Sequence, residues 1–395
     1  MAEVTATRDL AFPIAEYRHR LDLVCAAMES RGVDALICFG IQFTLPGHVT
    51  WIAGSEPRLG LTKAAMAVVL PGRPEELIVI GRAEPNEIWV DEFRFGFDFV
   101  PLLQGAIPSD VRRVGIAGWE LFPARVYAAL VAAYPHASFE PASDLLLELR
   151  KVKSPAEVEV MRRGARIAQS GVESMYALAR PGERERDLLA EYERTVRANG
   201  SDELPFATQV AGGPRTSQVT AHATERVLED GDVVRSDSGA LYRGYCSDIS
   251  RGTVVGTPSA RVRGVIEAAA EVYETCLAKI APGVHFTELV DLARRTATRH
   301  GLEESLGTLT VHGIGCNQDE YPHWSTGAAV PSRWTRGPGQ VETDTGFLEG
   351  MVCCFEPGIY VEGVGGLRLE EPFVVTRTGA ERLTNGLRVR LWERA

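Results

Sequence analysis

The chain has 395 residues, enough for two ordinary domains, and its hydrophobic content of 45% excludes wholesale disorder. Lysine and arginine together number 42, against 53 aspartates and glutamates, which gives a formal net charge of −11. This excess of negative charge argues against a nucleic-acid partner and against binding to an anionic membrane surface.

Cysteine usage and apolar runs bear on the compartment. The seven cysteines are scattered and show no CxxC spacing, which suits a reducing environment without a disulfide framework. No run of 18 apolar residues occurs, and the first 20 residues contain no apolar stretch of signal-peptide length. We therefore expect a cytoplasmic protein without a spanning helix.

The first 150 residues predict a compact α/β domain. An amphipathic helix is expected over residues 16–31, ending at Gly32. Short apolar runs predict strands at 34–40, 48–54, 64–70 and 76–81, and a second helix is expected at 120–133. We place the end of this domain at residue 150.

Residues 151–395 predict an α+β domain. Ser154, Pro155 and Glu157 form the signature of a capping box at the start of a helix. Long amphipathic helices are expected at 155–179, 182–199, 260–280 and 286–300, with hairpin-like strands at 232–255 and 350–376. Separate helices and antiparallel strands are typical of the α+β class.

Two aspartates in the segment "SDSGALYRGYCSDISRG" raise a question of charge. Asp237 and Asp248 are symmetric about the point between Tyr242 and Arg243. A turn there would make them direct cross-strand partners, with Cβ atoms about 4.5–5.5 Å apart. Like charges so close need a proton, a guanidinium or a divalent metal between them. The alternative is a surface hairpin with solvated acids.

A second pair of acids repeats the pattern. Glu356 and Glu370 are symmetric about Gly363 in the turn "VEGVGG", and His312 precedes them in "TVHGIG". Taken singly, such a histidine or glutamate is more often structural. Together, four carboxylates and one imidazole form an oxygen-rich set suited to two divalent ions, Mn²⁺ first, with Co²⁺ or Zn²⁺ as alternatives. Two such ions can share and activate a bridging water.

These segments resemble a known family. "DSGALYRGYCSDISR", "HGIG", "FEPGIY" and "GGLRLEE" are similar to the successive motifs of the pita-bread-fold metallopeptidases (M24), which include Xaa-Pro dipeptidase (prolidase), aminopeptidase P, methionine aminopeptidase and creatinase. "RLDLVCAAMESRGVDALICF" and "TWIAG" resemble the creatinase-type N-terminal domain. The resemblance implies that α/β domain, a pita-bread catalytic domain and a homodimer.

The resemblance also implies roles for individual residues. It assigns the metal ligands Asp237, Asp248, His312, Glu356 and Glu370. Asp248 and Glu370 would bridge both ions, and Glu356 would also act as general base. His222 matches a histidine that contacts the substrate and the developing oxyanion. Arg368 matches an arginine that holds the substrate carboxylate, and an ion pair that orients a ligand glutamate is the equal alternative.

One position departs from the family pattern. Family peptidases usually carry a second histidine seven residues after the ligand histidine, and here Asp319 stands there. An ionised aspartate would oppose an oxyanion, so the substrate-recognition shell is expected to differ. His323, four residues further on, is the candidate substitute for the missing histidine.

The leading hypothesis is a metal-dependent hydrolase of the Xaa-Pro dipeptidase type, in which a metal-bridged hydroxide attacks the amide carbonyl of a short peptide. One alternative is a creatinase- or ectoine-hydrolase-like enzyme that cleaves a non-peptide C–N bond, which Asp319 and the unusual loop at 324–347 favour. Another is a non-catalytic binding protein of the same fold. Adjacent Cys353 and Cys354 in an apolar strand are interpreted as packing residues.

Overall fold

The computed structural model describes residues 9–42, 47–54, 64–73, 77–81, 88–96, 98–327 and 344–391. Most of the loop expected at 324–347 therefore lies outside the described residues. The chain folds as two compact units that divide between Lys151 and Val152. Within the described ranges, no helix is both long enough and apolar enough to cross a membrane.

The first unit is built on one mixed sheet of six strands, in the order β4-β3-β2-β1-β5-β6. The strands are β1 (Ala35–Ile41), β2 (Ala64–Val69), β3 (Ile78–Gly81), β4 (Phe93–Phe95), β5 (Arg113–Ala117) and β6 (Ser138–Pro141). The helices are α1 (Ile14–Arg31), α2 (Gly47–Ala53), α3 (Phe99–Ala106), α4 (Ala124–Ala133) and α5 (Ser143–Arg150).

The strand expected at 48–54 is wrong, because this segment forms helix α2. Every residue of α2 is buried, so the segment has no polar face whose spacing could reveal a helical period. A short apolar run without such a period fits a buried strand and a buried helix equally well.

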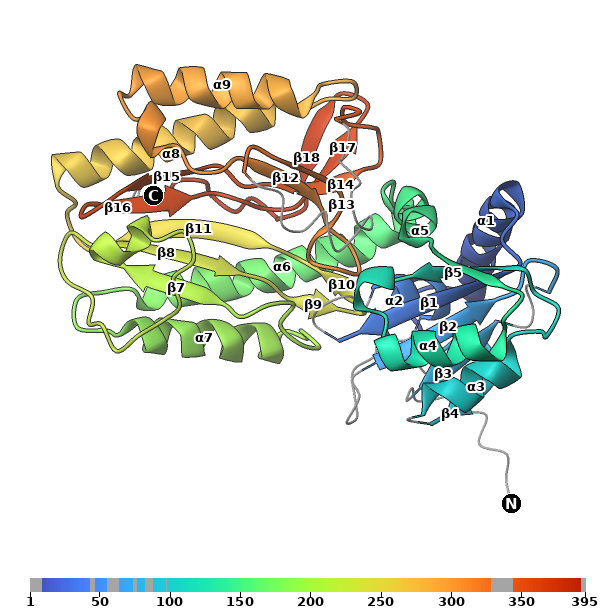
Figure 1. The fold of residues 1–395 in the computed structure, drawn as a ribbon. Helices are drawn as coiled ribbons and strands as arrows, with labels where there is room; N and C mark the ends of the chain where they lie inside the picture. The colour runs from blue at the N-terminus through green and yellow to red at the C-terminus, as the bar shows by residue number, and fades with distance from the viewer. Residues whose placement is uncertain are drawn as a thin grey trace. The chain divides into compact units, whose positions relative to one another are not determined.

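The second unit contains four long helices: α6 (Pro155–Leu178), α7 (Glu185–Ala198), α8 (Ala260–Lys279) and α9 (Phe286–Arg299). One sheet has the order β11-β8-β7 and a second has the order β13-β12-β14-β17-β18. Helices α6 and α7 lie along the first sheet, whereas α8 packs on β15 and β16 and α9 packs on α8 (Figure 1). This arrangement confirms the α+β class.

The strands of this unit are β7 (Gln209–Gly212), β8 (Val233–Ser238), β9 (Leu241–Tyr242), β10 (Tyr245–Cys246), β11 (Ile249–Val254), β12 (Thr310–Gly313), β13 (Glu320–Ser325), β14 (Val352–Phe355), β15 (Gly358–Val361), β16 (Gly365–Arg368), β17 (Phe373–Thr376) and β18 (Gly379–Arg382). All strand pairs of this unit are antiparallel.

The predicted capping box at the start of α6 is confirmed. The backbone N–H of Glu157 donates to Ser154 Oγ at 3.3 Å, and the backbone N–H of Ser154 donates to Glu157 Oε2 at 2.9 Å. The other carboxylate oxygen of Glu157 accepts a hydrogen bond from Tyr245 Oη at 2.8 Å. The cap therefore also ties α6 to the β9–β10 turn.

The predicted register of the first hairpin is wrong by two residues. Asp237 pairs with Ser250 rather than with Asp248. Tyr242 pairs with Tyr245, and the two turn residues Arg243 and Gly244 have φ values of 50° and 80°. A two-residue turn with both φ angles positive matches the twist of an antiparallel hairpin, so the chain reverses one residue later than the symmetry of the aspartates indicated.

The predicted register of the second hairpin is confirmed. Gly358 pairs with Arg368 and Val361 with Gly365, so the ladder is centred on Gly363 as expected. Gly363 has a φ of 71°, a left-handed conformation that glycine adopts without steric cost.

Candidate functional site

A row of paired residues runs across four chain segments of the second unit. Gln209 on β7 pairs with Asp237 on β8, and Asp237 pairs with Ser250 on β11. Ser250 in turn forms a backbone bridge with Glu370, through N–H···O=C hydrogen bonds of 3.1 and 3.0 Å. Because directly paired residues share a face of a sheet, this bridge brings the second acidic pair beside the first.

A second row carries the imidazole. His312 on β12 pairs with His323 on one side and with Cys354 on the other. The register of β12 and β13 shifts after His312, and a Cβ at Gly313 would lie 2.5 Å from the carbonyl oxygen of Tyr321. Only glycine fits this close backbone approach.

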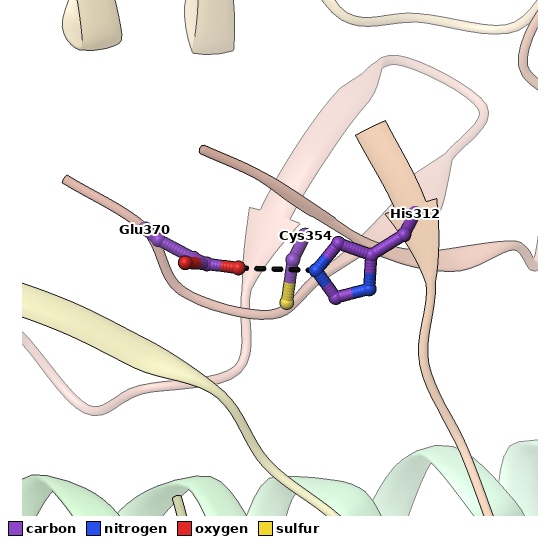
Figure 2. Close-up of side chains that lie close together, drawn as sticks. All are labelled: His312, Cys354 and Glu370. Atoms are coloured by element: carbon purple, nitrogen blue, oxygen red, sulfur yellow. Dashed lines mark hydrogen bonds and ion pairs between the residues drawn. The ribbon is translucent and has the colours of Figure 1, made fainter. Parts of the chain in front are cut away.

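The two rows meet at Glu370. His312 Nε2 lies 3.1 Å from Glu370 Oε1. Two triads of potential ligand atoms result, each with its three atoms within 4.8 Å of one another: Asp237, Asp248 and Glu370 in one, and His312, Cys354 and Glu370 in the other. Figure 2 shows the second triad, with the Cys354 sulfur beside the line that joins the imidazole to the carboxylate.

The hydrogen bonding of the triads fits a cation. Asp237 is 5% exposed and Asp248 is 2% exposed, yet Oδ1 of each accepts no hydrogen bond from any described residue. A buried carboxylate oxygen without a partner is costly. Coordination to a divalent ion would satisfy both Oδ1 atoms, because such ions accept carboxylate oxygens as ligands.

The carboxylates also raise one another's pKa values. Burial, followed by the charges of Glu370 and Asp237, raises the pKa of Asp248 well above its usual value. Burial and the charge of Glu370 raise the pKa of Glu356 to about 8, although Arg368 opposes this shift. Glu356 belongs to neither triad, and its carboxylate reaches the others through Arg368.

His312 and Glu370 stabilise one another as an ion pair. Burial alone would lower the pKa of His312, but its hydrogen bond to Glu370 and the charge of Asp319 raise that pKa well above the usual value. Burial alone would raise the pKa of Glu370, but His312 and Arg368 lower it. Among the four carboxylates, Glu370 is thus the one whose pKa is lowered, whereas the pKa values of the other three are raised.

Arg368 lies among the acids. Its guanidinium forms an ion pair with Asp237, lies 3.2 Å from Glu356 Oε2 through Nη1, and lies 3.7 Å from Glu370 Oε2 through Nε. These contacts match the alternative in which the arginine orients ligand carboxylates. Binding of a substrate carboxylate by Arg368 remains a prediction.

Asp319 and His323 adjoin the second triad. Asp319 Oδ2 lies 3.5 Å from His323 Nε2, and the His323 ring centroid lies 6.5 Å from that of His312. Burial raises the pKa of Asp319 to about 6, whereas burial and the charge of His312 lower the pKa of His323 to about 4. At neutral pH, the pair is therefore an aspartate beside an uncharged imidazole.

His222 is exposed and belongs to neither triad. Gln209 connects the segment that contains His222 to Asp237 through two hydrogen bonds. Gln209 Oε1 accepts the backbone N–H of Ala221 at 3.3 Å, and Gln209 Nε2 donates to Asp237 Oδ2 at 3.1 Å.

Three residues at the site were not identified as site residues from the sequence. Gln209 contacts Asp237, Gln318 Nε2 donates to Asp248 Oδ2 at 2.9 Å, and Cys354 joins the second triad. Strand alternation was a usable signal for Cys354, because it separates two adjacent cysteines onto opposite faces. Nothing in the sequence marked the two glutamines.

A buried ionic network holds the backbone of Glu370. Arg251 Nη1 donates to the carbonyl oxygens of Ser250 at 2.9 Å and Glu370 at 2.6 Å, and its Nη2 forms an ion pair with Glu371. Glu371 also accepts hydrogen bonds from Tyr273 and Arg382 at 3.0 and 2.6 Å. Both ends of this ion pair are fully buried, so the network fixes where Glu370 sits.

Known proteins are similar to this chain in sequence. The model of metallopeptidase family M24 matches residues 159–377, more than half of the chain. The chain is 27% identical over 361 residues to the Xaa-Pro dipeptidase of Pyrococcus horikoshii, covering 90% of this chain and 94% of that protein. It is 32% identical over 246 residues to the Xaa-Pro dipeptidase of Pyrococcus furiosus, covering 62% and 66%.

A solved structure is similar to this chain over nearly its whole length. The X-Pro aminopeptidase of Thermotoga maritima superposes with a TM-score of 0.80 at 25% identity, covering 94% of this chain and 99% of that one. The expected pita-bread fold is confirmed.

Proposed function

Because the chain belongs to metallopeptidase family M24 and is a metal-dependent peptidase, we propose that it hydrolyses short peptides of the Xaa-Pro type. The observation that carries this proposal is the meeting of two strand rows at Glu370. It gathers an imidazole with buried carboxylates, and Oδ1 of both Asp237 and Asp248 has no hydrogen-bond partner among the described residues. The full-length similarity to Xaa-Pro dipeptidases supports the same substrate class.

We assign the divalent ions to Asp237, Asp248, His312, Glu356 and Glu370. The two triads share Glu370, which supports a pair of ions. Carboxylates dominate the set, so Mn²⁺ is the expected metal, with Co²⁺ or Zn²⁺ as alternatives. When bound, such ions would polarise the amide carbonyl and lower the pKa of water.

Glu356 is proposed to hold and move the proton. In the metal-free chain, burial and the charge of Glu370 raise its pKa to about 8, so this carboxyl group holds a proton more tightly than an ordinary glutamate does. Arg368 contacts Glu356 and two further acids, so it orients them and compensates their charge. His222 is proposed to bind substrate, since it is exposed and its segment is tied to Asp237 through Gln209.

Asp319 supports a second candidate, hydrolysis of a non-peptide C–N bond in a small molecule. It lies beside His323, next to the His312 triad. A negative charge there disfavours an anionic tetrahedral species, whereas a protonated Asp319 could donate a hydrogen bond to it. With a pKa of about 6, Asp319 is mostly ionised at neutral pH. A peptidase would then use His323, which is uncharged and adjacent, as donor.

The family resemblance also supports a proposal about cellular location and oligomeric state. We propose that the protein is cytoplasmic and forms a homodimer. Sedimentation equilibrium would give the mass of the assembly.

Proline release from a panel of Xaa-Pro dipeptides tests the proposal, with Mn²⁺ added and again after chelation. The Asp237→Asn variant, which keeps the shape of the side chain but not its charge, serves as the inactive control. Turnover that chelation abolishes and Mn²⁺ restores is expected. A metal-loaded protein that cleaves none of the dipeptides, but does hydrolyse small cyclic or guanidino-type amides, would replace the first candidate with the second.

A further inference from the structure

The adjacent cysteines of β14 lie on opposite faces of their strand. Cys353 belongs to the apolar core beneath helices α8 and α9. Cys354 is equally buried but points to the other face, where His312 is its paired neighbour on β12. Strand alternation therefore separates a packing cysteine from a cysteine at the site.

The Cys354 sulfur lies among donors of other chain segments. Its Sγ, a ring nitrogen of His312 and a carboxylate oxygen of Glu370 are all within 4.8 Å of one another (Figure 2). The same sulfur lies 3.9 Å from the carbonyl oxygen of Asp248. Three side chains from separate segments thus converge with one nitrogen, one oxygen and one sulfur.

An independent observation in the adjoining triad supports a metal centre here. Glu370 belongs to both triads, and the other triad contains the buried Asp237 and Asp248 oxygens that no described residue satisfies. If Cys354 were only a packing residue, its burial would be explained. A packing role does not explain why its sulfur lies close to the imidazole of His312 and the carboxylate of Glu370.

We propose that Cys354 is a thiolate ligand of the ion held by His312 and Glu370, and that it makes this position selective for Zn²⁺ or Co²⁺ over Mn²⁺. A soft thiolate favours zinc-like ions, whereas an all-oxygen set favours manganese. The proposal rests on the metal centre of the proposed function. On coordination, a sulfur–metal bond forms and the thiol proton passes to solvent, with no change of oxidation state.

The metal position formed by the other triad does not include Cys354, and its ligand atoms differ in type. Asp237, Asp248 and Glu370 offer only oxygen, so this position should retain a preference for Mn²⁺. The two positions of one centre would therefore differ in metal preference.

X-ray absorption on the zinc-loaded wild-type protein tests the proposal directly. We expect a sulfur scatterer at about 2.3 Å from the zinc, the usual zinc–thiolate distance. Titration of the metal-free protein with Co²⁺ should give a near-ultraviolet sulfur-to-metal charge-transfer band, and titration with Cd²⁺ should give one at shorter wavelength. Bound metal is counted in the same samples.

Two matched variants assign the sulfur. Cys354→Ser should lose the charge-transfer band and lower the Zn²⁺-over-Mn²⁺ affinity ratio roughly tenfold or more. Cys353→Ser, the neighbouring residue on the core face, should keep both. If Cys354→Ser does not fold, Cys354→Ala and the wild-type absorption spectrum still decide the question.

The outcomes separate this inference from the proposed function. Metal that binds without a sulfur neighbour, or a band that persists in Cys354→Ser, overturns the inference and leaves the metallopeptidase intact. A chain that binds no divalent ion at all overturns both.

Discussion

Glu370 is the residue through which the two groups of ligand atoms are joined. It is 1% exposed, belongs to both triads, and is held by His312 through its side chain and by Ser250 through its backbone. The contact between its side chain and His312 joins the two strand rows.

At the residue scale, Glu370→Gln should weaken divalent-metal binding more than any exposed substitution. Removing one anionic oxygen from both triads should lower the affinity for Mn²⁺ at least roughly tenfold, since even residues that only orient ligands cost 10–100-fold. Equilibrium dialysis measures the affinity. Glu362→Gln, at an exposed position in the β15–β16 turn, is the control and should bind normally. Equal affinities of the two variants would contradict the shared role of Glu370.

The raised pKa of Glu356 predicts that the stability of the metal-free protein depends on pH. Its pKa is raised from 4.5 to about 8, so the folded state holds its proton more tightly than the unfolded state. The associated stability is present below the unfolded pKa and is lost as the pH rises through about 8. The loss is on the order of a few kcal/mol at most, because the side chain is 22% exposed and water screens it.

Glu356→Gln supplies the reference for that prediction. In chelator, the free energy of unfolding of the wild type minus that of Glu356→Gln should fall between about pH 5 and pH 8. Urea denaturation at each pH gives the difference. Saturating divalent metal should abolish the trend, because the cation stabilises the ionised carboxylate. A difference that stays flat in chelator would show that Glu356 titrates normally.

At the element scale, the capping box of α6 makes a local prediction. Ser154→Ala removes the acceptor for the Glu157 N–H and should cost about 1 kcal/mol of unfolding free energy. Ser170→Ala makes the same exchange inside this helix, where the propensity of alanine favours it and the change should stay within about 0.5 kcal/mol. Chemical denaturation compares the two. A cost at Ser170 equal to that at Ser154 would argue against the cap.

The Arg251–Glu371 pair predicts a larger effect. Both side chains are fully buried, so Glu371→Ala leaves an uncompensated guanidinium and should cost about 3–5 kcal/mol. It should also weaken metal binding, since Arg251 holds the Glu370 carbonyl. Glu381→Ala breaks an exposed ion pair with Arg162 and should cost at most about 1 kcal/mol. Similar losses in the two variants would contradict the importance of burial.

At the scale of the whole molecule, all candidate ligands belong to the second of the two units. Metal that binds only the folded state stabilises it by about 2.7 kcal/mol at one hundred times the dissociation constant. Hydrogen exchange should therefore slow on adding Mn²⁺ in β8, β11, β12 and β14, and stay unchanged in the β1–β2–β5 region of the first unit. Equal protection in both units would mean that metal binds elsewhere as well.

The sequence by itself determined the elements whose cause is local. Ser154, Pro155 and Glu157 set the start of α6, and the glycines around Gly363 set the register of the β15–β16 hairpin. The order of the acids and His312 also sufficed to indicate family and fold. Local rules failed where they were ambiguous: α2 has no polar face, and Arg243 with a positive φ moved the first turn by one residue.

Tertiary structure alone decided which side chains meet. The bridge between Ser250 and Glu370 spans more than one hundred residues and brings the two hairpins together. Other tertiary contacts bring Gln209 and Gln318 to the aspartates. The pairing of β12 with β14 places Cys354 beside His312, while Cys353 packs in the core. Pairing between distant strands depends on the packing of the whole unit, which no local pattern of residues encodes.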